Sequence, residues 1–201
     1  MRSLAGLSNV LLLITNHCNL KCEYCYVRQG VEVMAPSIAK KVIDNIDDGT
    51  IVDFFGGEPL LELDLLNSIV DYANSNGRRL VFQLFTNGTR YDSAVKELIL
   101  KGVNIGVSYD GLSQFKRTHS EELSQVILQN AKNMKKDIKG LGVKCSITPD
   151  NVNLMLDNCK YLYSEGFNFI SHFILREQGF WTDESIKSFQ NNLHGLLQWY
   201  I

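Results

Sequence analysis

The sequence predicts an α/β protein built on a partial (β/α)₆ TIM-like barrel, in which a parallel sheet carries helices on its outside. Short apolar runs of β type alternate six times with segments of helical periodicity, which is the pattern of a parallel sheet. The strand runs are apolar at nearly every position, as expected when both faces of a sheet are covered. Six units are fewer than the eight that close a barrel, so an open barrel is expected.

Each predicted strand is a short run rich in β-branched, leucine and aromatic residues. In chain order the runs are Val10–Ile14, 50–55 (TIVDFF), 79–85 (RLVFQLF), 103–108 (VNIGVS), 142–148 (GVKCSIT) and 167–174 (FNFISHFI). Pro149 stops the fifth run, because proline has no backbone N–H to donate. A doubly wound sheet is the alternative arrangement for the same elements.

Between the strands, apolar residues recur three and four positions apart, which indicates amphipathic helices. These segments lie around residues 36–46, 61–73, 94–99, 123–134, 154–163 and 186–200. Pro36 stands near the start of the first helix, and Asn76-Gly77 closes the second. No linker or low-complexity tract interrupts the 201 residues, so residues 1–201 are expected to form a single domain.

The composition excludes several classes of partner. Twenty basic side chains against twenty-two acidic ones give a formal net charge of −2, so neither a nucleic acid nor a membrane is expected as a partner. No segment approaches the roughly 18 consecutive apolar residues of a membrane span. The odd number of cysteines, five, argues against a disulfide scaffold, and a cytoplasmic location is expected.

Four polar or glycine-rich motifs each follow one of the first four predicted strands. They are CNLKCEYC (18–25), GGEP (56–59), TNG (86–88) and SYDG (108–111). The carboxyl ends of the strands line the active site in parallel α/β proteins. The four motifs are therefore expected to converge on one rim.

CNLKCEYC places three of the five cysteines within eight residues. Thiolates select zinc, copper(I) or iron–sulfur clusters. A structural zinc site needs four ligands, and Cys145 and Cys159 lie in core positions of a strand and a helix. Three thiolates can instead ligate three irons of a cubane cluster and leave the fourth iron open. From the cysteines alone, a zinc loop or a set of reduced thiols remains an alternative.

On these motifs the sequence resembles the radical S-adenosylmethionine (SAM) enzymes over essentially the whole chain. CNLKCEYC matches their CxxxCxxC loop, and GGEP resembles the element that meets the methionine end of SAM. SYDG resembles the SxDG of the branch that holds anaerobic sulfatase-maturing enzymes and SPASM-type peptide modifiers. The resemblance implies a [4Fe–4S] cluster on Cys18, Cys22 and Cys25, with SAM on the open iron. It implies an enzyme that cleaves SAM reductively to a 5′-deoxyadenosyl radical, which abstracts a substrate hydrogen.

The resemblance also implies contacts between SAM and further residues, whereas the catalytic chemistry belongs to the cluster and SAM. These contacts fall on Tyr24 for the adenine, Gly56, Gly57 and Glu58 for the methionine end, Ser108 and Asp110 for the ribose or carboxylate, and Asn87 and Arg117. Read without the resemblance, the same residues are a packed aromatic, ordinary strand-to-helix turns and a solvated arginine.

The SYDG branch implies a peptide or protein substrate and a one-electron donor such as flavodoxin or ferredoxin. The alternatives are a glycyl-radical-enzyme activase, a small-molecule radical SAM enzyme, or a metal-binding module without activity. SPASM-type relatives continue into a cysteine-rich region, but no cysteine follows Cys159 here. A C-terminal auxiliary-cluster domain is therefore expected to be absent or truncated.

Overall fold

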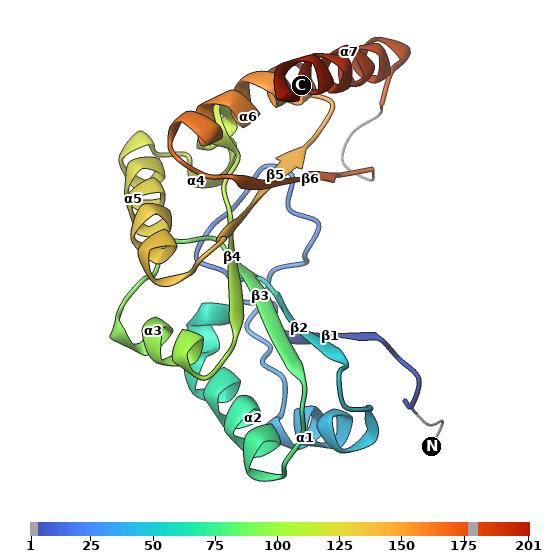
Figure 1. Ribbon diagram of the computed structural model, residues 1–201, viewed down its shortest axis with the longest axis vertical. Helices are drawn as coiled ribbons and strands as arrows, with labels where there is room; N and C mark the ends of the chain where they lie inside the picture. The colour runs from blue at the N-terminus through green and yellow to red at the C-terminus, as the bar shows by residue number, and fades with distance from the viewer. Residues whose placement is uncertain (1–3, 177–180) are drawn as a thin grey trace. The chain divides into compact units, whose positions relative to one another are not determined.

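The structure, a computed structural model, describes residues 4–176 and 181–201. Its strands are β1 (Asn9–Thr15), β2 (Ile51–Gly56), β3 (Val81–Thr86), β4 (Asn104–Ser108), β5 (Gly142–Ile147) and β6 (Phe169–Ile174). They form one parallel sheet in the order β1-β2-β3-β4-β5-β6 (Figure 1). This sequential order is that of a (β/α) barrel, whereas a doubly wound sheet reverses its order midway. The predicted fold class is confirmed.

The helices follow the predicted alternation with additions after the strand ends. The α-helices are α1 (Pro36–Asn45), α2 (Leu63–Ser75), α3 (Ser93–Leu100), α4 (Phe115–Thr118), α5 (Glu121–Asp137), α6 (Met155–Ser164) and α7 (Asp183–Tyr200). Short 3₁₀ turns, η1 (Pro59–Glu62), η2 (Gly111–Ser113) and η3 (Val152–Leu154), precede α2, α4 and α6. The single turn α4 was not expected, because four residues are too few for a periodic pattern.

The chain divides into two compact units that share the sheet's strands between them. Unit 1 comprises residues 1–19 and 27–106, and unit 2 comprises residues 20–26 and 107–201. The expectation of a single domain over residues 1–201 stays a prediction.

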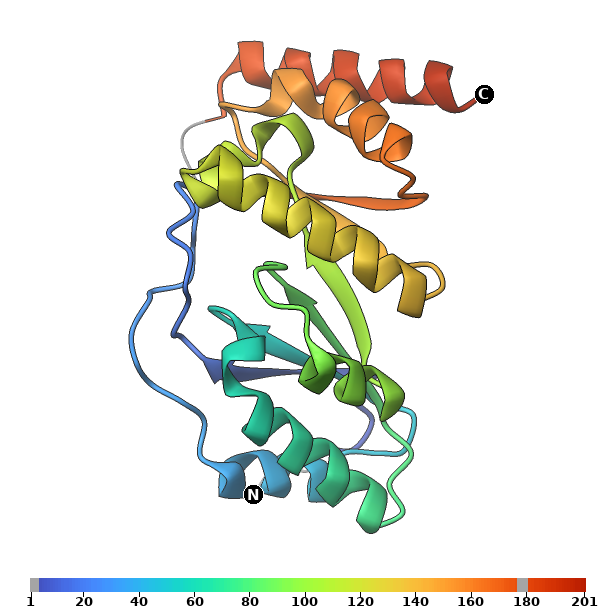
Figure 2. The same cartoon turned by 90° about the vertical axis from the view of Figure 1, so that its left-hand side faces the viewer.

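In unit 1, the helices cover one face of β1, β2 and β3. Figure 2 shows α2 and α3 in front of these strands, and α1 packs beside α2. Parallel crossovers are right-handed, so a sequential strand order brings all helices to the same side. Side chains on the helical face, such as Ile14, Val52 and Phe54, are buried. The other face carries Leu11 and Leu13, 54% and 47% exposed, so the expectation that both faces are covered is wrong here.

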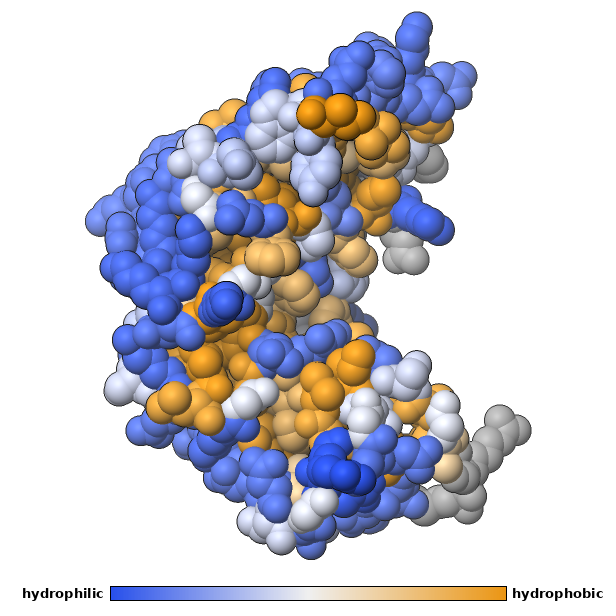
Figure 3. Space-filling view, in the orientation of Figure 1, coloured by the Kyte–Doolittle hydropathy of each residue, from blue (hydrophilic) through white to orange (hydrophobic). Residues whose placement is uncertain are grey.

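In unit 2, β5 pairs in parallel with β6, and α6 and α7 lie side by side (Figures 1 and 2). The core beneath α7 combines Ile147, Val152 and Met155, against which Trp181, Phe189 and Leu196 pack. Other apolar residues of α7 reach the surface, and orange atoms are visible over this helix in Figure 3. Among the described residues, every helix is too short or too polar to cross a membrane.

Candidate functional site

The motifs stand at the strand ends that the sequence predicted. β1 ends three residues before Cys18, Gly56 is the last residue of β2, Thr86 the last of β3 and Ser108 the last of β4. Within unit 1, β1, β2 and β3 are parallel, so the first three motifs begin at the same edge of the sheet. The half-buried Ser108 stands opposite Lys144 of β5 in unit 2.

The glycines of GGEP hold the chain that leads into the cysteine loop. Gly57 N–H donates to the Thr15 carbonyl at 2.8 Å, and Glu58 N–H donates to the His17 carbonyl at 2.9 Å. A Cβ on Gly57 would collide with the His17 carbonyl oxygen, and Gly56 has a φ of 151° that side chains disfavour. The two N–H groups of Gly57 and Glu58 therefore tie the β2 turn to the segment that enters the cysteine loop.

Glu58 is buried, and its carboxylate ties the β2 turn to the end of β3. One oxygen accepts from Leu60 N–H at 3.0 Å and from the Thr86 hydroxyl at 2.8 Å. The other oxygen accepts from Asn87 N–H at 2.6 Å. Bonds from three donors account for why a carboxylate that is only 2% exposed is tolerated here. Glu58 is thus placed to fix the Thr86–Asn87 turn.

The Asn87 side chain reaches back to the cysteine loop within unit 1. Its Nδ2 donates to Asn19 Oδ1 at 2.8 Å and lies 3.9 Å from Cys18 Sγ, within the distance of a hydrogen bond to sulfur. Its Oδ1 accepts from the N–H and hydroxyl of Thr89. The structure therefore brings together Cys18, Glu58 and Asn87, three of the predicted site residues.

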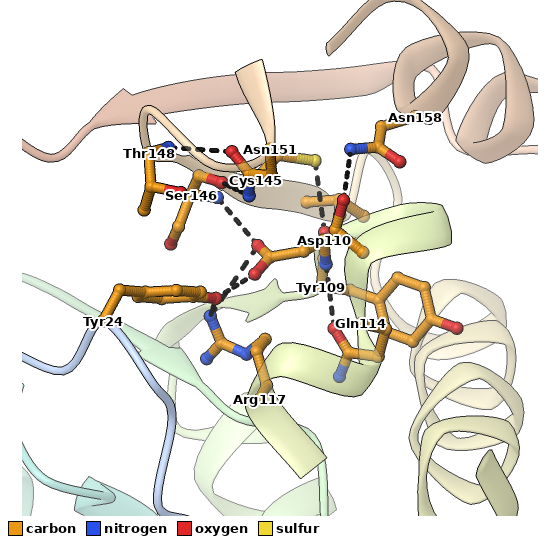
Figure 4. Close-up of polar contacts among 12 residues, drawn as sticks. Tyr24, Tyr109, Asp110, Gln114, Arg117, Cys145, Ser146, Thr148, Asn151 and Asn158 are labelled. Atoms are coloured by element: carbon orange, nitrogen blue, oxygen red, sulfur yellow. Dashed lines mark hydrogen bonds and ion pairs between the residues drawn. The ribbon is translucent and has the colours of Figure 1, made fainter. Parts of the chain in front are cut away.

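A second group, Tyr24, Asp110 and Arg117, meets inside unit 2 (Figure 4). The Tyr24 hydroxyl donates to Asp110 Oδ2 and accepts from Arg117 Nη1 at 3.0 Å. Arg117 Nη1 also lies 3.8 Å from Asp110 Oδ1, and its guanidinium carbon stands 5.9 Å from the centre of the Tyr24 ring. The predicted solvated alternative for Arg117 is wrong, because the residue is only 8% exposed.

Asp110 is the centre of this group and is fully buried. Its Oδ1 accepts from Ser146 N–H at 2.7 Å, and its own N–H donates to Gln114 Oε1 at 2.9 Å (Figure 4). Burial raises the pKa of the Asp110 carboxyl to about 6, although Arg117 and the Ser146 N–H act in the opposite direction. Asp110 therefore links the end of β4 to β5 and to the tyrosine of the cysteine loop.

The cysteine loop divides between the units: Cys18 belongs to unit 1, whereas Cys22 and Cys25 belong to unit 2. The unit 2 part is anchored to α4 and its C-cap. Glu23 N–H donates to the Lys116 carbonyl at 3.0 Å, and the His119 ring bonds the Lys21 carbonyl at 2.8 Å. All three cysteines are half-buried and none of them forms a disulfide, so each keeps the thiol that metal ligation requires.

Cys145 and Cys159 are free thiols of a different kind, because both are buried. Cys145 is fully buried in β5 and donates from Sγ to the Tyr109 carbonyl at 3.1 Å. Burial raises the pKa of both thiols. The prediction that these two cysteines pack in the core is confirmed.

The sequence did not single out Asn19 and Thr89, which hold the Asn87 carboxamide. Asn19 lies 68 residues from Asn87, and such a contact leaves no local pattern to detect. Thr89 gives a weak signal, since Asn and Thr side chains often bond the backbone two residues away in turns. Gln114 and Ser146, which bond Asp110, carry no sequence signal of their own.

The parallel sheet has sequential strand order, and cysteines or polar turns follow its first four strands, which is the arrangement of barrel-type α/β proteins. The sequence matches the Radical SAM superfamily over residues 12–178. The chain therefore belongs to this superfamily of enzymes. Radical SAM enzymes use a [4Fe–4S] cluster and SAM.

Two curated relatives are similar to this chain over most of its length. The chain is 30% identical over 191 residues to the uncharacterized protein MJ0907 of Methanocaldococcus jannaschii, covering 85% of this chain and 64% of that one. It is 29% identical over 157 residues to a probable GTP 3′,8-cyclase of Methanococcus maripaludis strain C5, covering 74% and 49% of the two chains. It thus spans half to two thirds of the length of these relatives.

Among solved structures, the chain resembles native anSMEcpe with bound AdoMet and Cp18Cys peptide. The TM-score is 0.76 at 23% identity, over 94% of this chain and 59% of that chain. At this identity the likeness establishes the fold alone.

Proposed function

We propose that this chain reductively cleaves SAM at a [4Fe–4S] cluster held by Cys18, Cys22 and Cys25, and abstracts hydrogen from a peptide or protein side chain. The observation that carries this proposal is the set of three half-buried cysteines in one eight-residue stretch of a radical SAM chain. When bound, the cluster and SAM supply the 5′-deoxyadenosyl radical that enzymes of this family use. The residues around them supply positioning and exclusion of water.

The donor and acceptor chemistry of the described residues suits these cofactors. Thiolates are the ligands that hold iron–sulfur clusters, and the GGEP turn has carbonyl oxygens for the SAM ammonium group. Gly56 and Gly57 let a ligand approach the backbone, while Glu58 and Asn87 fix the neighbouring turn. We assign the SAM adenine to the Tyr24 ring, whose hydroxyl Asp110 and Arg117 hold in place.

Ser108 is the remaining residue that we assign to SAM, through its ribose or carboxylate. It is half-buried at the end of β4, two residues before Asp110. Asp110 and Arg117 already bond each other and Tyr24, so we assign both to positioning the tyrosine instead of direct contact with SAM.

The proposed peptide substrate is supported by the SYDG motif and by the fold shared with anSMEcpe, which was solved with a peptide. A small-molecule substrate is the second candidate, and the similarity to a probable GTP 3′,8-cyclase favours it. We further propose a flavodoxin or ferredoxin as electron donor. The five cysteines form no disulfide, which supports our proposal of a reducing, cytoplasmic location.

Anaerobic reconstitution with iron and sulfide, followed by dithionite and SAM, tests the cleavage step. We expect 5′-deoxyadenosine from the wild-type protein and none from a variant with Cys18, Cys22 and Cys25 replaced by alanine. Cys159→Ala is the matched control, because it removes a thiol from the core and should keep the cluster. If wild-type protein with a full [4Fe–4S] cluster makes no 5′-deoxyadenosine, the proposal is wrong.

Deuterium transfer distinguishes the two substrate classes. Peptides deuterated at their side chains, or deuterated GTP, are incubated with the loaded enzyme, and the 5′-deoxyadenosine is analysed by mass spectrometry. Deuterium transferred from a peptide into 5′-deoxyadenosine supports the peptide substrate. Transfer from GTP and not from any peptide would contradict the peptide substrate and support a small-molecule substrate.

A further inference from the structure

The carboxamide of Asn87 has only one orientation that fits its neighbours. Its Oδ1 faces two donors of Thr89, the N–H at 3.0 Å and the hydroxyl at 2.7 Å. An NH₂ group in that place would meet the Thr89 N–H, which cannot accept a hydrogen bond. Nδ2 must therefore point to the opposite side.

On that side, Nδ2 has two hydrogens and two acceptors. Asn19 Oδ1 lies 2.8 Å away and Cys18 Sγ 3.9 Å away. Asn19 in turn donates from its Nδ2 to the Thr89 hydroxyl at 2.9 Å. Asn87, Asn19 and Thr89 thus form a closed ring, in which the second Asn87 N–H is directed at the sulfur.

The donor is also held in position by the backbone of its own turn. Asn87 N–H is bonded to Glu58, and Gly88 N–H donates to the Thr86 hydroxyl at 3.1 Å. Asn87 is only 5% exposed, so water competes little for its side chain. A hydrogen bond to a charged acceptor is stronger in such surroundings than in water.

We propose that Asn87 is a positioning residue that donates an N–H···S hydrogen bond to the Cys18 thiolate and thereby raises the reduction potential of the [4Fe–4S] cluster. This inference rests on the proposed function, since it requires Cys18 to be a cluster ligand. Reduction adds one electron from the external donor, with no bond formed or broken. The added negative charge spreads onto the thiolate sulfurs, so a donor at Cys18 stabilises the reduced form more than the oxidised form.

The reduction potential of the loaded protein tests this inference, measured by redox titration of the EPR signal of the reduced cluster. Asn87→Asp keeps the size and the oxygen that faces Thr89, but replaces the donor with a carboxylate oxygen. We expect roughly a tenfold lower ratio of reduced to oxidised cluster at a fixed potential, which corresponds to about 59 mV for one electron. Asn87→Ala should shift the potential in the same direction.

Asn19→Ala is the matched control, because it opens the ring but leaves the Asn87 donor beside Cys18. We expect its potential to remain close to that of the wild type. A purely structural role for the ring would instead shift Asn19→Ala and Asn87→Ala alike, and that result would overturn the inference.

A second measurement does not require an Asn87 variant that holds the cluster. Protein labelled with ¹⁵N-asparagine should show a ¹⁵N hyperfine coupling to the reduced cluster in pulsed EPR, and the coupling should persist in Asn19→Ala. If wild-type protein with a full [4Fe–4S] cluster shows no such coupling, the inference about Asn87 is overturned but the proposed function is not. Wild-type protein that takes up no [4Fe–4S] cluster would overturn the proposed function, and the inference with it.

Discussion

Tyr24 donates its hydroxyl hydrogen to the carboxylate of Asp110, a residue 86 positions further along the chain. Arg117 completes the contact by donating to the same hydroxyl and pairing with the same carboxylate. The aromatic residue of the cysteine loop is therefore held by the SYDG motif through its side chain.

Tyr24→Phe removes the hydroxyl and keeps the ring. Asp110 and Arg117 then each lose a partner in a buried place, which is expected to lower the free energy of unfolding by about 1–3 kcal/mol. Chemical denaturation measures this change. Tyr26→Phe is the control, because Tyr26 is 49% exposed. Loss of its hydroxyl should change the free energy of unfolding by less than about 0.5 kcal/mol. Equal effects of the two substitutions would contradict the prediction.

Asp110→Asn should change how stability depends on pH. The pKa of Asp110 is raised to about 6 from an ordinary value of 3.8, so the folded protein holds this proton more tightly than the unfolded chain. The resulting stabilisation is fully present below about pH 3.8 and is lost as the pH rises through about 6. As the pH rises from about 3.8 to about 6, the free energy of unfolding of the wild type should fall by about 3 kcal/mol relative to that of Asp110→Asn.

Denaturation curves of both proteins at several pH values from 3.5 to 7.5 measure this difference. Parallel pH profiles would show that the Asp110 pKa is not raised, and a difference of opposite sign would show that Arg117 outweighs burial.

Glu58→Gln keeps the shape of the side chain but turns one acceptor oxygen into an NH₂ group. That group must face either Asn87 N–H or the donors Leu60 N–H and Thr86 hydroxyl, so at least one buried donor loses its partner. The free energy of unfolding should fall by about 1–3 kcal/mol in thermal or chemical denaturation. Glu97→Gln, on the exposed side of α3, should have almost no effect.

Gly57→Ala should separate the β2 turn from the entry to the cysteine loop. The added Cβ would overlap the His17 carbonyl oxygen and approach Cys18 Cβ, so the two bonds of this turn to Thr15 and His17 cannot both survive. We expect a loss of about 3 kcal/mol of stability and weaker retention of iron in the reconstituted protein.

Gly142→Ala is the control for this substitution, because nothing lies within 4 Å of a Cβ at Gly142. Iron and sulfide content after gel filtration compares the two. Retention of a full cluster by Gly57→Ala would show that the turn does not shape the loop.

Sequence patterns were sufficient for the six strands, their helices and the position of each motif at a strand end. Apolar runs and turn residues are local signals, so they can be read without knowing the fold. The three clustered cysteines and the two core cysteines were likewise distinguished by their spacing and by the elements that carry them.

Contacts between distant residues could not be predicted in this way. The Tyr24–Asp110 bond joins residues 86 apart, and the Asn87–Asn19 bond joins residues 68 apart, so both exist only after the strands have paired. The uncovered face of β1 was also missed, because Leu11 and Leu13 look like core residues in a run of leucines. Whether an apolar strand residue is buried depends on which face of the sheet the helices cover, and no local sequence pattern indicates that face.

The bonds from Gly57 and Glu58 to Thr15 and His17 bear on how iron is acquired. They fix the backbone up to the residue before Cys18 by means of the sheet alone. Ordering a flexible backbone costs about 1–2 kcal/mol per residue, and for this segment that entropy is lost when the strands pair. An incoming metal would therefore meet Cys18 on a backbone that is already ordered. The free energy of metal binding would then not have to offset the ordering of this segment.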